Sequence, residues 1–215
     1  GLVEHTADMG ILPGVAARWE VLEGGTRYVF HLRDDVRWSD GLPVTAHDFE
    51  YAWKRILDPA TGPGLASALY DIRGARAYHE GLELEPSEVG VRAQDDRTLF
   101  VELEAPAGYF LELVAYGPPV PRHTVERWGA AWTDPENMVC NGPFTLAAWR
   151  PGERLVLERN PLYYGRFVGN LERVELTLAP AGEWIPALED YEADRADWFS
   201  FEATFPEEMD QVRER

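Results

Sequence analysis

Cys140 and His123 come nearest in this sequence to a nucleophile with its base. A cysteine thiol becomes a strong nucleophile when a positioned histidine removes its proton. No nucleophile motif surrounds Cys140, and as the only cysteine it can form neither an intrachain disulfide nor a cysteine cage for a metal. We therefore predict that Cys140 is a small, buried packing residue and that neither side chain is catalytic.

Acidic residues occur in adjacent pairs that raise the question of acid–base catalysis: Asp34-Asp35, Asp95-Asp96 and Glu207-Glu208. Each pair lies in a polar turn or at a helix start, where solvated carboxylates are normal. His47 beside Asp48 lacks the larger ligand cluster of a zinc or iron site. The same holds for His5 near Asp8, and no phosphate-binding glycine motif is present. We therefore predict that the chain is not an enzyme and that it has no catalytic residue, no metal site and no cofactor. An enzyme is the competing class.

The clearest structural pattern in the sequence lies in the stretch Trp38 to Pro59, which predicts a helix. Thr45 with Asp48 three residues later is typical of an N-cap with an acid in the first turn, so the helix is predicted to begin at Ala46. Asp58-Pro59 should end it. Its apolar residues share one face, which predicts burial of that face: Phe49, Trp53 and Ile56.

The same stretch, W-S-D-G-L-P-V-T-A-H-D-F-E-Y-A-W-K-R-I-L-D-P, resembles the family 5 extracellular solute-binding proteins, which are the peptide, dipeptide and nickel receptors of ABC importers. Five further stretches follow the family's order: Pro13 to Glu20, Tyr28 to Trp38, Val89 to Leu103, Pro119 to Glu126 and Asn141 to Tyr164. The resemblance covers nearly the whole chain and weakens after about Pro180. It implies a solute receptor with a periplasmic-binding-protein-like fold of type II.

Charge and composition limit the partners of this chain. It has 20 basic and 38 acidic residues and a net charge of −18, so long-range repulsion opposes binding to nucleic acid. No apolar run approaches the roughly 18 residues of a membrane-spanning helix. The 45% hydrophobic content is sufficient for a substantial core.

Hydrophobic periodicity predicts a mixed α/β fold (α+β). The predicted strands are residues 26–33, 155–158, 174–178 and 198–201, together with a hairpin of residues 89–93 and 98–103 around an acidic turn. The predicted helices, besides the one at Ala46, are residues 66–78, 109–116, 123–128 and 184–193.

A proline-rich connector at Gly117 to Pro121 is the best predicted domain boundary. The resemblance implies that residues 1–121 form a small lobe and residues 122–215 form one segment of a discontinuous large lobe. It also implies that the family's first strands, before Gly1, and its second ligand-clasping lobe, after Arg215, are missing. On this basis we expect the chain to be a fragment of a longer receptor.

Leu65 and Tyr70 are the candidate ligand-binding residues. Peptide receptors of the family often have S-P-Y-A-S where this chain has G-P-G-L-A-S, so Leu65 occupies the place of an aromatic ring that faces the ligand. Tyr70 lies just over one helical turn later and is a candidate for the same place or for the core. The Asn141-Gly142-Pro143 stretch is predicted to be a structural turn between lobe segments.

The resemblance implies a receptor that binds a peptide or another small solute in its full-length form and delivers it to an ABC transporter permease. Its location would be periplasmic or extracellular, with attachment to the membrane only through an anchor on the parent protein, such as that of a lipoprotein. The alternative is a receptor-like sensor or interaction module fused to a regulatory or signalling protein, which would be cytoplasmic.

Overall fold

The computed structural model describes residues 1–6, 8, 10–61, 64–82, 85–165, 169–178 and 185–198, without the side chains of residues 65, 185 and 186. The chain forms two compact units. The first contains residues 1–145 and 159–170, and the second contains residues 146–158 and 171–215. Both helices and antiparallel sheets are present, which confirms the predicted mixed α/β class.

The compact units do not coincide with the lobes predicted to meet at Pro121, because residues 122–145 belong to the first unit. The predicted lobes are parts of a longer two-lobed receptor, and their boundary remains a prediction.

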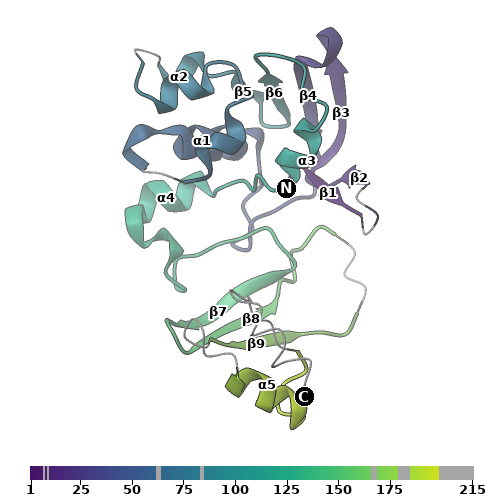
Figure 1. Ribbon diagram of the computed structural model, residues 1–215, viewed down its shortest axis with the longest axis vertical. Helices are drawn as coiled ribbons and strands as arrows, with labels where there is room; N and C mark the ends of the chain where they lie inside the picture. Colours follow the sequence, from purple (N-terminus) through teal and green to yellow (C-terminus); the bar gives the residue numbers. More distant parts are fainter. Residues whose placement is uncertain are drawn as a thin grey trace. The chain divides into compact units, whose positions relative to one another are not determined.

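A four-stranded antiparallel sheet organises the first unit (Figure 1). Its strands lie in the order β3 (Ala16–Leu22), β4 (Arg27–Leu32), β6 (Thr98–Glu102) and β5 (Val91–Asp95). The strand predicted at residues 26–33 is β4, and its alternate residues are buried: Tyr28, Phe30 and Leu32. The predicted hairpin is formed by β5 and β6, which confirms a turn at the acidic pair.

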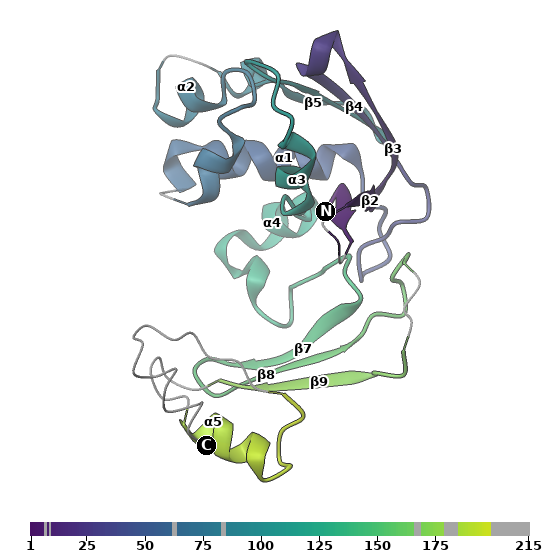
Figure 2. The same cartoon turned by 45° about the vertical axis from the view of Figure 1, so that its right-hand side comes forward.

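Helix α1 (Ala46–Leu57) packs against β5 and β6, and Figure 2 shows it on the same side of the sheet as α3 (Phe110–Ala115) and α4 (Arg122–Trp128). The predicted start and end of α1 are confirmed. Phe49 and Trp53 are fully buried, and burial of each ring contributes about 1.5–3 kcal/mol. At its N-terminus the Asp48 carboxylate accepts the Thr45 N–H at 2.8 Å and the Thr45 hydroxyl at 3.1 Å, which confirms the predicted cap.

The prediction of one helix over residues 66–78 is wrong. The structure has a 3-10 helix, η3 (Leu65–Leu69), and a separate short helix, α2 (Ala75–His79). Between them Ile72 forms a β-bridge with Leu103, and Gly74 has a φ of 72°, outside the right-handed helical region. Helical spacing of the apolar residues therefore continues across a segment whose backbone is held by the sheet.

Three strands of the first unit were not predicted: β3 and the two-stranded sheet of β1 (Val3–His5) and β2 (Ile11–Pro13). Strands of three residues are too short to show a period. In β3 only Ala16 is buried and five of the seven residues are exposed, so no alternation marks it as a strand. Pairing with the adjacent strand, and not an apolar period of their own, determines these strands.

The second unit is built on a three-stranded sheet in the order β7 (Phe144–Arg150), β8 (Arg154–Arg159) and β9 (Arg173–Thr177). The strands predicted at residues 155–158 and 174–178 are β8 and β9, whereas β7 was not predicted. Helix α5 (Ile185–Glu192) confirms the helix expected at 184–193, apart from Trp184, which lies outside the described residues. Of the strand expected at residues 198–201, only Trp198 is among the described residues, and it is not in a strand.

Candidate functional site

The two predicted ligand-binding residues belong to the η3 segment. Leu65 is the first residue of η3, and its side chain lies outside the described part of the structure. Tyr70 caps the C-terminal end of η3 and is half-buried against the core. The Arg76 guanidinium lies 5.0 Å from the Tyr70 ring centroid, and the His79 ring lies 5.8 Å from it. The role of both residues in ligand binding stays a prediction.

Cys140 and His123 have different hydrogen-bond partners. The Cys140 thiol donates to the Phe144 carbonyl at 3.1 Å, and burial raises the pKa of this thiol, which favours the protonated form. The His123 ring pairs through Nε2 with Asp40 at 2.8 Å. A protonated thiol and a histidine bound to another group do not form the activated pair that nucleophilic catalysis requires.

The Trp38-Ser39-Asp40-Gly41 turn connects distant parts of the first unit. The Ser39 N–H donates to the Cys140 carbonyl at 2.8 Å, and the Cys140 N–H donates to the Ser39 hydroxyl at 3.2 Å. Asp40 binds His123 of α4 from the same turn. The turn therefore fixes α4 and the segment before Asn141 to the first unit, which gives these residues a structural role.

Two of the carboxylates considered for acid–base chemistry have local partners. Asp35 forms an ion pair with Arg33 at 2.9 Å, and this contact lowers the pKa of the Asp35 carboxyl. The Asp95 carboxylate accepts the Arg97 N–H at 2.8 Å, as turn carboxylates do. Glu207 and Glu208 lie outside the described residues. Among the residues that the structure describes, no three His, Cys, Asp or Glu side chains are grouped to hold a metal ion.

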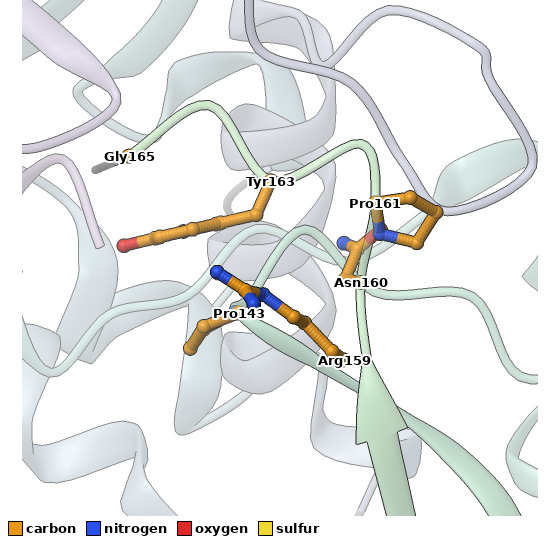
Figure 3. Close-up of a pocket in the computed structure, with 6 residues that line it drawn as sticks. All are labelled: Pro143, Arg159, Asn160, Pro161, Tyr163 and Gly165. Carbon is orange, nitrogen blue, oxygen red and sulfur yellow. The ribbon is translucent and has the colours of Figure 1, made fainter. Parts of the chain in front are cut away.

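A hollow of about 180 Å³ with polar side chains in its lining lies in the first unit (Figure 3). Two stretches of chain line it: Pro143, and Arg159, Asn160, Pro161, Tyr163 and Gly165. Figure 3 shows the Arg159 and Tyr163 side chains extending along the hollow, with Pro143 beside the Arg159 guanidinium. The site thus combines a cation, a phenol and apolar rings.

Asn160 holds the two sides of this hollow together. It is 4% exposed, and its Nδ2 donates to the Gly142 carbonyl at 2.8 Å while its Oδ1 accepts the Leu162 N–H at 3.0 Å. Its own backbone N–H donates to the Pro143 carbonyl at 2.8 Å. These bonds keep the turn at residues 142–143 against the segment 160–163, which agrees with the structural role predicted for the Asn-Gly-Pro stretch.

Tyr163 and Tyr164 are both half-buried. The Tyr164 hydroxyl donates to Glu4 at 3.0 Å, and the Arg33 guanidinium lies 5.4 Å from the Tyr164 ring centroid. Burial, and secondarily the charge of Glu4, raises the pKa of Tyr163 and also that of Tyr164. Both phenols therefore keep their protons at neutral pH and can act as donors.

Sequence patterns did not identify Arg159 or Tyr163 as site residues. The one signal was their position inside the stretch Asn141 to Tyr164, which begins with a turn and ends with two tyrosines before Gly165. A β-carbon at Gly165 would lie 2.5 Å from the Tyr163 ring, so glycine is required there for the ring to occupy its place. That requirement is visible only in three dimensions.

Among the helices of the described ranges, none has the length and apolar content needed to cross a bilayer.

Comparison with known proteins gives a consistent result. Residues 10–210 match the family described as "Bacterial extracellular solute-binding proteins, family 5 Middle". The chain is 43% identical over 168 residues to the periplasmic oligopeptide-binding protein OppA of Escherichia coli, a match that covers 76% of this chain and 31% of OppA. It is 41% identical over 179 residues to the probable deoxycholate-binding periplasmic protein YgiS of the same organism, covering 81% of this chain and 33% of YgiS.

Among solved structures, Haemophilus influenzae OppA in complex with the peptide RPPGFSPFR superimposes with a TM-score of 0.89 and 34% identity, covering all of this chain and 42% of that one. This likeness confirms the fold predicted from the resemblance. The chain spans about a third of the length of the two curated relatives.

Proposed function

The chain belongs to the bacterial extracellular solute-binding proteins of family 5, and from this we propose that it is part of a receptor that binds peptides for an ABC importer. The observation that carries the proposal is the likeness to oligopeptide-binding proteins in both sequence and structure, at 43% identity to one OppA and a TM-score of 0.89 with another. The partners we propose are a peptide and the permease of the importer.

We propose a periplasmic or extracellular location, since both curated relatives named above are periplasmic proteins. Attachment to the membrane would come from an anchor on the parent protein. The chain itself would act by binding alone, without catalysis. The raised pKa of the Cys140 thiol and its hydrogen bond to the Phe144 carbonyl support this part of the proposal.

Ligand binding in this proposal depends on two lobes that close over the solute, so that affinity comes from groups on both walls. Residues 1–121 would be the small lobe and residues 122–215 part of the large one. Leu65 and Tyr70 would face the ligand from the small lobe. The Tyr70 ring, with Arg76 5.0 Å from its centroid, would offer a peptide a stacking surface and a nearby positive charge.

A second candidate ligand is an amphipathic steroid acid. The 41% identity to the probable deoxycholate-binding protein favours it. Leu65 supports it as well, because an aliphatic side chain in place of an aromatic ring removes a hydroxyl that could bond to a peptide.

A thermal-shift screen of the full-length product of the open reading frame distinguishes the two ligands. The panel contains di- to pentapeptides, deoxycholate and an unrelated sugar as control. A ligand present at 100 times its Kd stabilises the folded state by about 2.7 kcal/mol, which raises the melting temperature measurably. Stabilisation by peptides supports the proposal, stabilisation by deoxycholate alone supports the second candidate, and no response to either contradicts both.

The same screen with Tyr70→Ala tests the predicted site. We expect the peptide-induced shift to shrink, while Tyr109→Ala, a control at an exposed tyrosine that bonds to Asp71, leaves it unchanged. An unchanged shift in Tyr70→Ala would assign Tyr70 to the core.

A further inference from the structure

The four-stranded sheet of the first unit has a protected edge at β5. The Ala93 N–H, which points away from β6, donates to the Glu50 carboxylate of α1 at 2.8 Å. An ion pair with Lys54 at 2.6 Å holds Glu50 in place. At the same edge, the Val91 N–H donates to the Val89 carbonyl at 2.7 Å. Backbone groups occupied in this way do not pair with the strand of another chain.

The opposite edge of the sheet is β3, and it is open beyond its first residue. Figure 1 shows β3 at the outer edge of the sheet, with β4 as its one neighbour there. The Ala16 N–H donates to the Leu2 carbonyl at 2.9 Å. Within the part of the chain that the structure describes, the backbone of residues 17–21 has hydrogen-bond partners only on β4.

The alternation of an antiparallel sheet identifies the groups that face this open edge. In β4, the Leu32 N–H donates to the β6 side, to the Arg97 carbonyl at 2.7 Å. Successive residues of a strand point in opposite directions, so the odd-numbered residues of β4 face β3. Their partners in β3 are its even-numbered residues. The N–H and C=O groups of Trp19 and Val21 therefore point to the open edge.

The charges of β3 are complementary to those of a second β3 strand that runs in the opposite direction. Registers centred on neighbouring residues bring different charges together. A two-fold axis at Glu20 places the two Glu20 carboxylates opposite each other, and an axis at Val21 aligns Glu20 with Leu22. An axis at Trp19 aligns Arg18 with Glu20 of the second copy, and Glu20 with Arg18. Opposite charges in directly facing positions stabilise the pairing of strands, so charge selects the axis at Trp19.

The register centred on Trp19 also covers apolar surface. Val21 is 50% exposed and lies opposite Ala17 of the second copy, which is exposed as well. Trp19 is half-buried against the core and meets its own copy at the axis. A strand of seven residues gives a small interface, and small interfaces are typical of weak, reversible complexes.

We propose that β3 is a dimerisation edge, at which two copies of this chain pair antiparallel about a two-fold axis through Trp19 and join their sheets into one. The two Trp19 N–H groups donate to each other's carbonyls across the axis. Each Glu20 carboxylate, 2.8 Å from Arg18 of its own strand, also meets Arg18 of the second copy. The proposal does not rest on peptide binding.

The test is sedimentation velocity of the 215-residue chain and of the full-length product at increasing concentration. We expect a reversible monomer–dimer equilibrium with a Kd between the micromolar and the millimolar range. Hydrogen–deuterium exchange followed by NMR locates the contact. Protection of the Trp19 and Val21 amides should rise with concentration, whereas that of Ala93, already bonded to Glu50, should not change.

Charge variants test the register. Arg18→Glu leaves acids at both charged positions of β3 and Glu20→Arg leaves cations at both, so each variant alone should stay monomeric where the wild type dimerises. Mixed in equal amounts, the two variants should form a heterodimer, because each acid then faces a cation. Arg92→Glu is the control: it makes the same change of charge as Arg18→Glu, but at the β5 edge beside Phe100, and should dimerise as the wild type does.

Several results would overturn the proposal. One is a wild-type chain that stays monomeric up to millimolar concentration. Another is a dimer that persists in either charge variant alone, or the absence of a heterodimer on mixing; both residues are exposed, so these variants keep the fold. Protection of Trp19 and Val21 at every concentration in the full-length product would show that another segment of the parent covers the edge. Protection that appears only with added di- to pentapeptides would make the occupant a peptide.

Discussion

Replacing Asn160 by alanine tests whether one buried amide holds the candidate site together. The side chain is 4% exposed and makes two hydrogen bonds, to the Gly142 carbonyl at 2.8 Å and from the Leu162 N–H at 3.0 Å. Each such bond contributes about 1 kcal/mol net, and a backbone group left buried without a partner costs about 1–3 kcal/mol. Relaxation and entry of water will recover part of this, so we expect Asn160→Ala to lower the free energy of unfolding by about 2–4 kcal/mol.

The assay is urea unfolding followed by tryptophan fluorescence, with linear extrapolation to water. The matched control is Asn137→Ala, which removes the same side chain where it is half-buried and makes one hydrogen bond, to the Ala131 carbonyl at 2.9 Å. The control should lose about 1 kcal/mol. Equal losses in the two variants, or a loss below about 0.5 kcal/mol for Asn160→Ala, would refute the reasoning, because surface substitutions commonly fall in that range.

Three further predictions concern the first unit. Asp48→Ala removes the α1 cap and should cost about 1–2 kcal/mol in urea unfolding, more than Thr45→Ala, which leaves the backbone bond to Asp48 intact. The hydrogen bond from Arg33 lowers the pKa of the Asp35 carboxyl below its ordinary value of 3.8. The pair therefore stabilises the fold fully above pH 3.8, and this contribution is lost as the pH falls through the lowered pKa of the folded state. The stability difference between the wild type and Asp35→Asn should vanish in acid and persist at neutral pH. Burial raises the pKa of the Cys140 thiol, so its alkylation by iodoacetamide at neutral pH should be slower than that of the amino acid cysteine in solution. An equal rate would contradict the raised pKa.

The parts of the fold that sequence could predict are those determined by local patterns. Helix α1 has a cap, an apolar face and a proline stop within consecutive residues, and β4 alternates buried and exposed positions. Where pairing with another segment of the chain decides the structure, the predictions failed. Ile72 carries helical spacing but pairs with Leu103, and β3 pairs with β4 without any alternation of its own.

The candidate site followed the same rule. Family resemblance pointed to Leu65 and Tyr70, whose role stays a prediction, whereas the hollow at Arg159 and Tyr163 depends on the Asn160 bonds across to the turn at residues 142–143. Seventeen or more residues separate these partners in sequence, so no local pattern joins them. The turn itself was predictable from its residue types. That it forms one wall of a hollow was not.

Calorimetry of peptide binding tests the central claim most directly, with the 215-residue chain and the full-length product compared under the same conditions. If the chain is part of a receptor whose two lobes close over a peptide, the full-length protein should bind at least one di- to pentapeptide with micromolar affinity or tighter, about 8 kcal/mol or more. The 215-residue chain alone should bind no tighter than the millimolar range, because one wall of the site would be absent. Equally tight binding by the 215-residue chain, or no peptide binding by the full-length protein, would contradict the account.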